Sequence, residues 1–258
     1  MSSIHPTAII SPQAEIGSGV EIGPYCVIGG GVVLGDGCRL QNMVTIQGPS
    51  CIGARNVFYT GAAIGQQTQD LKYKGEPTFL ETGDDNVFRE YCTVNRGTLP
   101  GSKTIIGCHN HFLAYCHIAH DCVVGSHVIF SNNGTLAGHV VVEDHVILGG
   151  LTAVHQFCRI GSYAITGGCS KIVQDVVPFM IADGNPAATR GVNLVGLQRA
   201  GFSEEDIRAI KEAYKAVFMR KQNTGAALEE LAKSPHAANP RVAKLMAFIQ
   251  ASSRGITK

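Results

Sequence analysis

Large apolar residues recur at every sixth position through most of this chain. An amphipathic helix repeats its apolar face about every 3.6 residues and a strand about every 2, so a period of six fits neither. Such a period is the hexapeptide repeat typical of a parallel β-helix. In the most regular stretch these positions are Ile106, Phe112, Ile118, Val124, Phe130, Leu136, Val142, Leu148, Val154, Ile160, Thr166 and Ile172.

The same period begins near the N-terminus and is interrupted twice. It runs first through Ile4, Ile10, Ile16, Ile22, Ile28, Leu34, Leu40, Ile46, Ile52, Phe58 and Ile64. The polar stretch 65–80 then has no periodicity, and a shorter break follows at 97–103. A long loop inside a compact repeat is typical of a functional or a disordered segment. The sequence leaves a ligand-binding loop and a solvated insertion equally open.

Three hexads form one coil of 18 residues with three short strands, and successive coils pair as parallel strands about 4.8 Å apart. Residues 18 apart in the sequence therefore lie above one another on the wall of the prism. His120, Gly138 and Gln156 share one such column, and Asp121 shares the neighbouring column with His139.

The repeat decays after Ile172, and the glycine- and proline-containing stretch 184–191 marks its end. We therefore predict a parallel β-helix over 1–190, with the loop insertion at 65–80, and an α-helical domain over 191–258. Ser203 and Asp206 have the spacing of a helix N-terminal capping box. An apolar stripe at helical spacing follows from Ile207 to Phe218. We expect Gly225 to end this unit, a short helix over 226–232, and a last helix opened by Pro240.

Charge is distributed unevenly along the 258 residues, although the net charge is only +1. Residues 1–189 contain 9 Lys and Arg against 14 Asp and Glu, whereas residues 190–258 contain 12 against 6. The basic tail suits an acidic partner, but a solvated basic helix explains the same charges equally well. Neither reading indicates a nucleic acid partner.

Six of the nine cysteines occupy the small position two residues before an inward apolar one, where packing explains them. They are Cys26, Cys38, Cys92, Cys116, Cys122 and Cys158. There is no CxxC pair, and residues 1–12 contain neither a basic leader nor a long apolar run. We therefore expect a reduced cytoplasmic protein without stable membrane insertion.

Four of the ten histidines, His117, His120, His139 and His155, fall within about two coils. A base above a glycine with a free backbone N–H could combine proton abstraction with oxyanion binding, which favours His120. Asp121 could orient its ring. Surface solvation is the simpler interpretation for the others, which are His5, His109, His111, His127, His145 and His236. The HxxH spacing of His117 and His120 also allows a zinc site, but on a coil this signal is weak.

Five segments together resemble a known family over nearly the whole chain. They are QDLKYKGEPT (69–78), HIAHDC (117–122), LAGHV (136–140), HQFCRIG (155–161) and GFS (201–203). In this order they are similar to the UDP-N-acetylglucosamine 3-O-acyltransferases, which catalyse the first step of lipid A synthesis.

This resemblance implies a left-handed parallel β-helix, an exception to the usual right-handed crossover, followed by a helical domain. It implies a homotrimer with active sites between neighbouring prisms and no cofactor or metal. The implied reaction moves an (R)-3-hydroxyacyl group from acyl carrier protein to the 3-hydroxyl of UDP-N-acetylglucosamine. His120 would be the general base, Asp121 its support, and the Gly138 N–H the oxyanion donor.

The resemblance also implies the residues that bind the substrates. Asp70 and Lys72 would contact the sugar nucleotide, with His117 and His139 beside the glucosamine. His155 and Gln156 would lie one coil further along, Asn193 and Arg199 would approach the nucleotide, and Gly168 would limit acyl length. The carrier protein would meet Lys211, Lys215, Arg220 and Lys221.

Three other functions remain as alternatives. The enzyme that N-acylates a glucosamine intermediate would be expected to carry an additional N-terminal domain, whereas here the hexads begin at Ile4. A zinc-dependent hydratase of the carbonic anhydrase type would contain stoichiometric metal. A noncatalytic scaffold would yield no product from acyl donor and acceptor.

Overall fold

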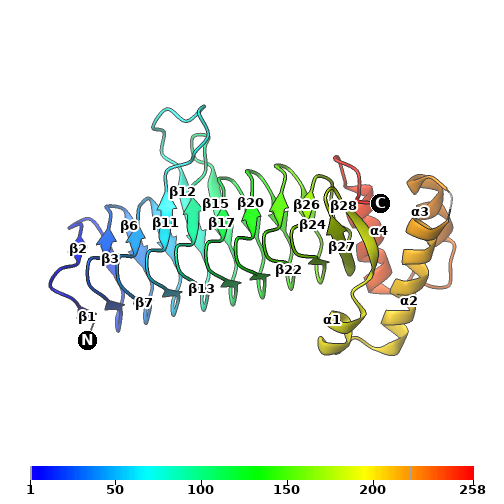
Figure 1. Ribbon diagram of the computed structural model, residues 1–258, viewed down its shortest axis with the longest axis horizontal. Helices are drawn as coiled ribbons and strands as arrows, with labels where there is room; N and C mark the ends of the chain where they lie inside the picture. Colours follow the sequence, from blue (N-terminus) through cyan, green and yellow to red (C-terminus); the bar gives the residue numbers. More distant parts are fainter. Residues whose placement is uncertain (1, 221) are drawn as a thin grey trace.

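The computed structural model describes residues 2–220 and 222–258, and it forms a long triangular prism closed at one end by helices (Figure 1). One wall is an 11-stranded sheet of β1 (Ser3–Ile4), β4 (Glu21–Ile22), β7 (Arg39–Leu40), β10 (Val57–Phe58), β13 (Val87–Phe88), β16 (His111–Phe112), β19 (Ile129–Phe130), β22 (Ile147–Leu148), β25 (Ile165–Thr166), β27 (Met180–Gly184) and β28 (Ala187–Val192). All its pairs are parallel except the last, β27 with β28.

The other two walls are wholly parallel sheets. The 9-stranded sheet contains β2 (Ile9–Ile10), β5 (Val27–Ile28), β8 (Thr45–Ile46), β11 (Ala63–Gln66), β14 (Thr93–Asn95), β17 (His117–Ile118), β20 (Thr135–Leu136), β23 (Ala153–Val154) and β26 (Lys171–Ile172). The 8-stranded sheet contains β3 (Glu15–Ile16), β6 (Val32–Leu34), β9 (Ser50–Ile52), β12 (Phe79–Thr82), β15 (Lys103–Ile106), β18 (Val123–Val124), β21 (Val141–Val142) and β24 (Arg159–Ile160). The chain therefore visits the three walls in turn, and the predicted left-handed parallel β-helix is confirmed.

The predicted 18-residue register is confirmed wherever the repeat is unbroken. His117 pairs with Thr135, and Thr135 in turn with Ala153. The sixth-position residues face inward and form one continuous core. In that core Phe58, Phe88, Phe112 and Phe130 lie in a column with ring centroids 5.0 to 5.1 Å apart. All six cysteines of the small position are buried.

Both insertions preserve the register because each adds a whole number of hexads. Across the first one Phe58 pairs with Phe88, a separation of 30 residues. Across the second one Phe88 pairs with Phe112, a separation of 24. Both insertions leave the prism at the edge between the 9-stranded and 8-stranded sheets, and the longer loop projects well clear of the wall (Figure 1).

The corners of the prism depend on a backbone conformation that L-residues rarely adopt. The third residue after an inward one commonly has a positive φ, as at Asp121 (60°), His139 (59°) and Phe157 (66°). Such a left-handed residue is normally disfavoured by contact between Cβ and the backbone. Here it turns the chain from one sheet to the next, and it lines up the corner side chains along each edge.

Three histidines that we expected to be only solvated form one of these corner columns. The rings of His109 and His127 stack with centroids 5.0 Å apart, and those of His127 and His145 are 4.8 Å apart. Tyr163 continues the column at 4.5 Å from His145. Solvation alone was therefore an incomplete interpretation, since each ring also covers its neighbour.

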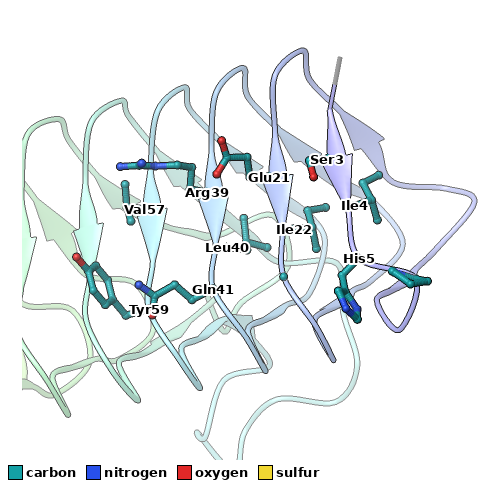
Figure 2. A pocket seen from close by; sticks show the side chains of 12 residues that line it. Ser3, Ile4, His5, Glu21, Ile22, Arg39, Leu40, Gln41, Val57 and Tyr59 are labelled. Carbon is teal, nitrogen blue, oxygen red and sulfur yellow. The ribbon is translucent and has the colours of Figure 1, made fainter.

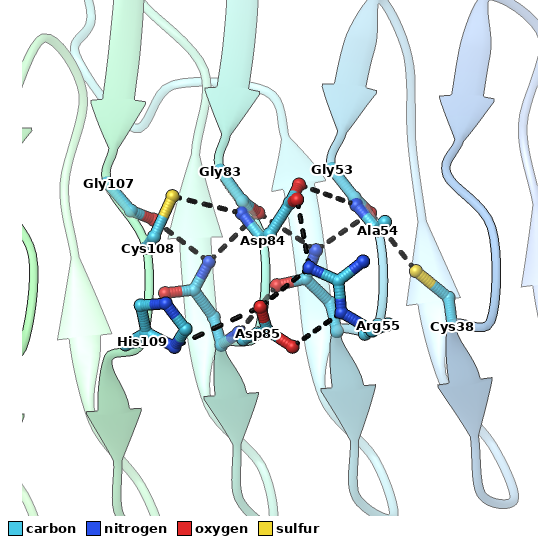
Figure 3. Close-up of polar contacts among 12 residues, drawn as sticks. Cys38, Gly53, Ala54, Arg55, Gly83, Asp84, Asp85, Gly107, Cys108 and His109 are labelled. Carbon is cyan, nitrogen blue, oxygen red and sulfur yellow. Dashed lines mark hydrogen bonds and ion pairs between the residues drawn. The ribbon is translucent and has the colours of Figure 1, made fainter.

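An asparagine ladder stabilises the edge between the 8-stranded and 11-stranded sheets. Figure 3 shows this edge, with Arg55, Asp85 and His109 labelled on its outside. Asn56, Asn86 and Asn110 are fully buried at the small inward position. The Asn86 amide donates to the carbonyls of Gly83 and Gly107, and its oxygen accepts from the Asn110 N–H. On the outside of the same corner, hydrogen bonds from Arg55 lower the pKa of the Asp85 carboxyl.

Asn86→Ala is expected to destabilise the prism by on the order of 3 kcal/mol, because three buried backbone groups lose their partner. Chemical unfolding followed by circular dichroism measures this loss. Arg55→Ala is the matched control on the same corner, since it removes only the outer ion pairs with Asp84 and Asp85 and should change stability little. Equal losses in the two variants would contradict the structural role of the ladder.

The C-terminal segment is helical, as predicted, with one boundary placed wrongly. Its elements are α1 (Leu194–Arg199), α2 (Glu204–Tyr214), a wider π-helical turn η1 (Lys215–Met219), α3 (Thr224–Ala232) and α4 (Pro240–Gln250). The Ser203 side chain accepts from the Asp206 N–H, so the predicted cap is confirmed. Gly225 does not end the preceding unit, because it lies in the first turn of α3, where the Asn223 side chain caps the helix.

These helices form a second apolar core against the last coil, centred on Leu197, Ile210, Val217 and Leu245. The predicted division at 190/191 falls inside β28, which pairs with β27 as an extension of the prism wall. A division of the chain into two domains stays a prediction. Within the described ranges no helix is both long and apolar enough to span a bilayer.

Candidate functional site

The candidate site lies on the prism edge between the 9-stranded and 8-stranded sheets. The corner between β17 and β18 contains His120 and Asp121, and the corner one coil later, between β20 and β21, contains Gly138 and His139. Both insertions leave the prism at this same edge, on the preceding coils. Successive corners are joined by the main chain, since the His139 N–H donates to the His120 carbonyl at 3.1 Å.

His120 and Asp121 form a hydrogen-bonded pair although they are adjacent in sequence. His120 Nδ1 lies 2.8 Å from Asp121 Oδ2, and the two side chains are only 14% and 8% exposed. The left-handed backbone of Asp121 turns its carboxylate back toward the preceding ring. With Nδ1 held by the carboxylate, Nε2 is the ring nitrogen left for proton transfer.

Gly138 leaves the space that the His120 ring occupies. A Cβ at this position would lie 2.4 Å from His120 Cε1 and 2.5 Å from Nε2. The Gly138 N–H has no hydrogen-bond acceptor within residues 2–220 and 222–258. The His120 ring therefore lies directly against Gly138, as expected for residues 18 apart in one column.

His139 and His117 are further histidines near this pair. His139 Nε2 lies 3.8 Å from Asp121 Oδ2, and its ring stacks on Phe157 with centroids 4.8 Å apart. His117 Nδ1 lies 2.7 Å from the Thr93 hydroxyl. Two imidazoles, those of His120 and His139, thus lie close to the carboxylate of Asp121.

The pKa of the Asp121 carboxyl is lowered despite its burial. Burial by itself raises this pKa, while Ser102, the bond to His120 and the charge on His139 lower it. The Ser102 hydroxyl does not reach hydrogen-bonding geometry, so we attribute the lowering chiefly to the two histidines. The carboxylate is consequently ionised at neutral pH and can hold His120 in position.

Burial, and then the charge on His120, lower the pKa of His117. The unfolded chain therefore binds this proton at a higher pH than the folded chain, and stability falls as the pH drops below about 6.5. We expect His117→Gln to weaken this loss, measured as melting temperature between about pH 7.5 and 5.5. His111→Gln changes an exposed histidine and is the matched control. Equal dependence of melting temperature on pH in the wild type and both variants would refute the expectation.

The remaining predicted site residues do not contact this pair within one chain. Asp70 and Lys72 lie in the long loop, where the Lys72 N–H donates to Asp70 Oδ1 at 2.9 Å. His155 and Gln156 are exposed at the next corner of the same edge, between β23 and β24. Gly168 lies on a different edge, between β25 and β26.

Asn193 and Arg199 belong to the two ends of α1. The Asn193 side chain is 7% exposed, accepts from the Gly196 N–H and donates to the Tyr163 carbonyl. It is engaged in capping α1, so a contact with nucleotide stays a prediction. Arg199 is exposed in the last turn of the helix.

The predicted carrier-protein contacts lie on the helices at the end of the prism. Lys215 pairs with Glu212 at 2.8 Å, and Arg220 pairs with Glu230. Lys211 lies in the last turn of α2. Lys221 lies outside the described residues.

The side chains that could share a metal ion differ from the HxxH pair considered first. Ligand atoms of His120, Asp121 and His139 all lie within 4.8 Å of one another. Imidazole and carboxylate are donors that zinc accepts in proteins. This is the arrangement that a metal assay should address, rather than His117 with His120.

Two grooves open on the outer surface of the prism. One of about 790 Å³ lies at its N-terminal end (Figure 2). It is lined by residues of β1, β4, β7 and β10, including Glu21 and Arg39, and by Tyr59, which follows β10. It lies several coils from His120, and we assign no chemistry to it. A second one of about 400 Å³ lies between β25 and α1 and is lined mainly by Ile165, Ile181, Leu194 and Val195.

Sequence reasoning missed several neighbours of the site, among them Phe157 and Thr98. Phe157 could have been found, since it lies 18 residues after His139 in the same column. Thr98, whose N–H donates to Asp121 Oδ2 at 3.1 Å, could not have been found in this way. It lies in the second insertion, where the 18-residue spacing is broken.

Comparisons with known proteins point to the same family along the whole chain. A family profile described as "Udp N-acetylglucosamine O-acyltransferase; Domain 2" matches residues 175–257, and a bacterial transferase hexapeptide profile matches residues 13–48. The acyl-[acyl-carrier-protein]–UDP-N-acetylglucosamine O-acyltransferase of Verminephrobacter eiseniae is 49% identical over the full length of both chains.

Solved structures agree with this comparison. LpxA from Acinetobacter baumannii has a TM-score of 0.95 and 43% identity, with 99% of each chain covered. UDP-N-acetylglucosamine acyltransferase from Arabidopsis has a TM-score of 0.88 and 39% identity, covering 99% of this chain and 100% of that one. With such identity over complete chains, this protein belongs to the UDP-N-acetylglucosamine O-acyltransferase family.

Proposed function

We propose that this protein transfers an (R)-3-hydroxyacyl group from acyl carrier protein to the 3-hydroxyl of UDP-N-acetylglucosamine, the first step of lipid A biosynthesis. The observation that carries the proposal is the His120 ring, held by the Asp121 carboxylate on one side and facing the main chain of Gly138 on the other. The names and coverage of the relatives support the same acyl transfer.

In the proposed mechanism His120 Nε2 takes the proton of the 3-hydroxyl. The oxygen then attacks the thioester carbonyl and forms the new carbon–oxygen bond. The Gly138 N–H would stabilise the negative charge that develops on the carbonyl oxygen, as a preorganised donor. The carbon–sulfur bond breaks as the intermediate collapses, and the thiolate of the carrier takes the proton back from His120. Asp121 stabilises the imidazolium between the two transfers.

The acceptor would bind along the same prism edge. Asp70 and Lys72 extend from the long loop toward the nucleotide, and His117 and His139 lie beside the glucosamine. His155 and Gln156 would contact substrate one coil further along. Because these positions follow one edge, a sugar nucleotide could lie parallel to the prism axis.

Gly168 and the apolar groove beside β25 support a site for the acyl chain. The groove is lined by Gly167, next to Gly168 in sequence, and by aliphatic side chains. A Cβ at Gly168 would meet only the Gly150 carbonyl, at 3.5 Å, so this position has open space. A glycine here would admit a longer acyl chain than a bulky residue.

A homotrimer would bring these separate parts together. Gly168, Asn193 and Arg199 do not reach His120 within one chain, since they lie on a different edge and on α1. If neighbouring prisms pack side by side, the edge with His120 on one subunit can face Gly168 and α1 of the next. The basic residues Lys211, Lys215 and Arg220 would then meet the acidic carrier protein at the end of the prism.

The purified protein should therefore convert UDP-N-acetylglucosamine and a hydroxyacyl carrier protein to the 3-O-acyl product. Mass spectrometry of the product and titration of the released carrier thiol measure the reaction, and a panel of acyl lengths defines the donor. Absence of product with every donor would overturn the proposal.

A zinc-dependent hydratase is the second candidate, supported by the proximity of His120, Asp121 and His139. Elemental analysis of the purified protein separates the two candidates. Stoichiometric zinc together with carbon dioxide hydration would favour the hydratase. Acyl transfer that persists after treatment with a chelator would favour the transferase.

A further inference from the structure

The base of the long loop is joined by hydrogen bonds to the residues just before the second insertion. The Arg96 N–H donates to the Gln66 carbonyl at 2.9 Å, and its guanidinium donates to the Gly65 carbonyl at 2.7 Å. The Asn95 amide donates to the Gln67 carbonyl at 2.9 Å. Arg96 itself is only 8% exposed. The base of the long loop is therefore fixed to the end of β14, just before the second insertion, rather than free on the surface.

A pair of buried hydroxyls continues this connection. Thr68 in the long loop and Thr98 in the second insertion are 3% and 4% exposed, and their Oγ1 atoms lie 2.8 Å apart. Thr68 Oγ1 also accepts from the Asp70 N–H at 3.1 Å. The two buried hydroxyls are thus hydrogen-bonded to each other.

Thr98 extends the connection to the His120–Asp121 pair. Its main-chain N–H donates to Asp121 Oδ2 at 3.1 Å, the same oxygen that lies 2.8 Å from His120 Nδ1. A continuous hydrogen-bonded path consequently runs from the Asp70 main chain through Thr68 and Thr98 to Asp121.

We propose that Thr68 and Thr98 are positioning residues that fix the acceptor-binding loop relative to the His120–Asp121 pair. This inference rests on the proposed function, in which Asp70 and Lys72 contact the sugar nucleotide. Thr68 acts through the loop alone, whereas Thr98 acts on the loop through its hydroxyl and on Asp121 through its N–H. A correctly placed loop would then bind the acceptor where the base can reach it.

Isosteric valine variants test the proposal through separate kinetic constants. Thr68→Val should raise the KM for UDP-N-acetylglucosamine about tenfold with little change in kcat, because a buried hydroxyl loses its partner at the loop. Thr98→Val should raise the same KM and also lower kcat, because the backbone that holds Asp121 is disturbed. The KM for the acyl carrier protein should stay unchanged in both variants.

Three further variants make the test specific. Thr68→Ser and Thr98→Ser retain the hydroxyl and should restore the acceptor KM. In the double valine variant the rise in acceptor KM should be smaller than the product of the two single rises, because both changes remove the shared Thr68–Thr98 bond. Thr152→Val is the matched control: it breaks another buried hydroxyl pair, with Thr166 at 3.0 Å, and should leave the acceptor KM unchanged.

The proposed function and the positioning role fail in different ways. A wild-type protein that forms no acylated sugar nucleotide overturns both. An active wild type whose Thr68→Val and Thr98→Val variants keep the wild-type acceptor KM overturns the positioning role alone. Serine variants as impaired as the valine variants, or a Thr152→Val variant with the same rise in KM, would also overturn it.

Discussion

His120→Ala is expected to lower turnover by about 10²- to 10⁴-fold, the usual contribution of a general base. The ring is the only part of the proposed mechanism that gains and loses the transferred proton. Truncation at Cβ leaves the inward row of the coil untouched, so the prism should stay folded. Steady-state turnover with saturating acyl carrier protein and UDP-N-acetylglucosamine measures the loss, and circular dichroism checks the fold.

A second histidine variant tests whether removing any imidazole lowers turnover or whether the loss is specific to His120. His111 is an exposed residue of β16 on the 11-stranded sheet, away from the proposed catalytic edge. His111→Ala should keep wild-type turnover. Near-normal turnover of His120→Ala would remove His120 from the mechanism, and it would leave the family assignment intact.

Gly138→Ala should reduce turnover nearly as strongly, although it removes no functional group. The added Cβ would lie 2.4 Å from His120 Cε1, so the ring must rotate or the corner must shift. A displacement of about 1 Å at a reacting group can cost about 10² in rate. We therefore expect kcat to fall by about two orders of magnitude, measured under the same saturating conditions.

The backbone at Gly138 does not by itself require glycine, which makes the experiment interpretable. Its φ is not among the positive values of the chain, so alanine introduces crowding without backbone strain. Gly150→Ala is the control, because a Cβ there would meet nothing closer than the Asn132 carbonyl at 3.5 Å. Full activity in Gly138→Ala would show that the ring can move without cost and would contradict the tight base–glycine arrangement.

The two neighbouring histidines explain why Asp121 can support His120 throughout the useful pH range, because they lower the pKa of its carboxyl although burial raises it. Its pKa is lowered in the folded protein, so its ionised form stabilises the fold above the pKa of the unfolded carboxyl, about 3.9. That contribution is lost as the pH falls through the lower, folded value. Protonation of this carboxyl therefore occurs only under acidic conditions, well below the range in which histidine titrates.

The six-residue period of the sequence predicted the prism because only one arrangement of the coil buries all the apolar side chains. Each sixth residue must face the interior for the coil to bury any apolar surface, and equal coils then stack residues that are 18 apart. Even the insertions obey this constraint, since Phe58 meets Phe88 and Phe88 meets Phe112 in one aromatic column. His120 lies above Gly138 for the same reason, since the two residues are 18 apart in the sequence.

Predictions made from the type of a single residue were less dependable, because helix capping and side-chain stacking depend on neighbouring residues. Gly225 was expected to end a helical unit, but Asn223 caps a helix that contains it. His109, His127 and His145 were expected to be only solvated, but their rings stack along a corner. In both places the outcome depended on neighbours that the residue's own type does not specify.

The sequence by itself therefore determined the coil, its inward row and the alignment of His120 with Gly138, because a fixed period leaves one way to bury the apolar side chains. Only the tertiary structure decided that Asp121 turns back onto the His120 ring, because this depends on a left-handed corner with a φ of 60°. It also decided that Thr68 reaches Thr98, since irregular loops meet through contacts that no repeat encodes.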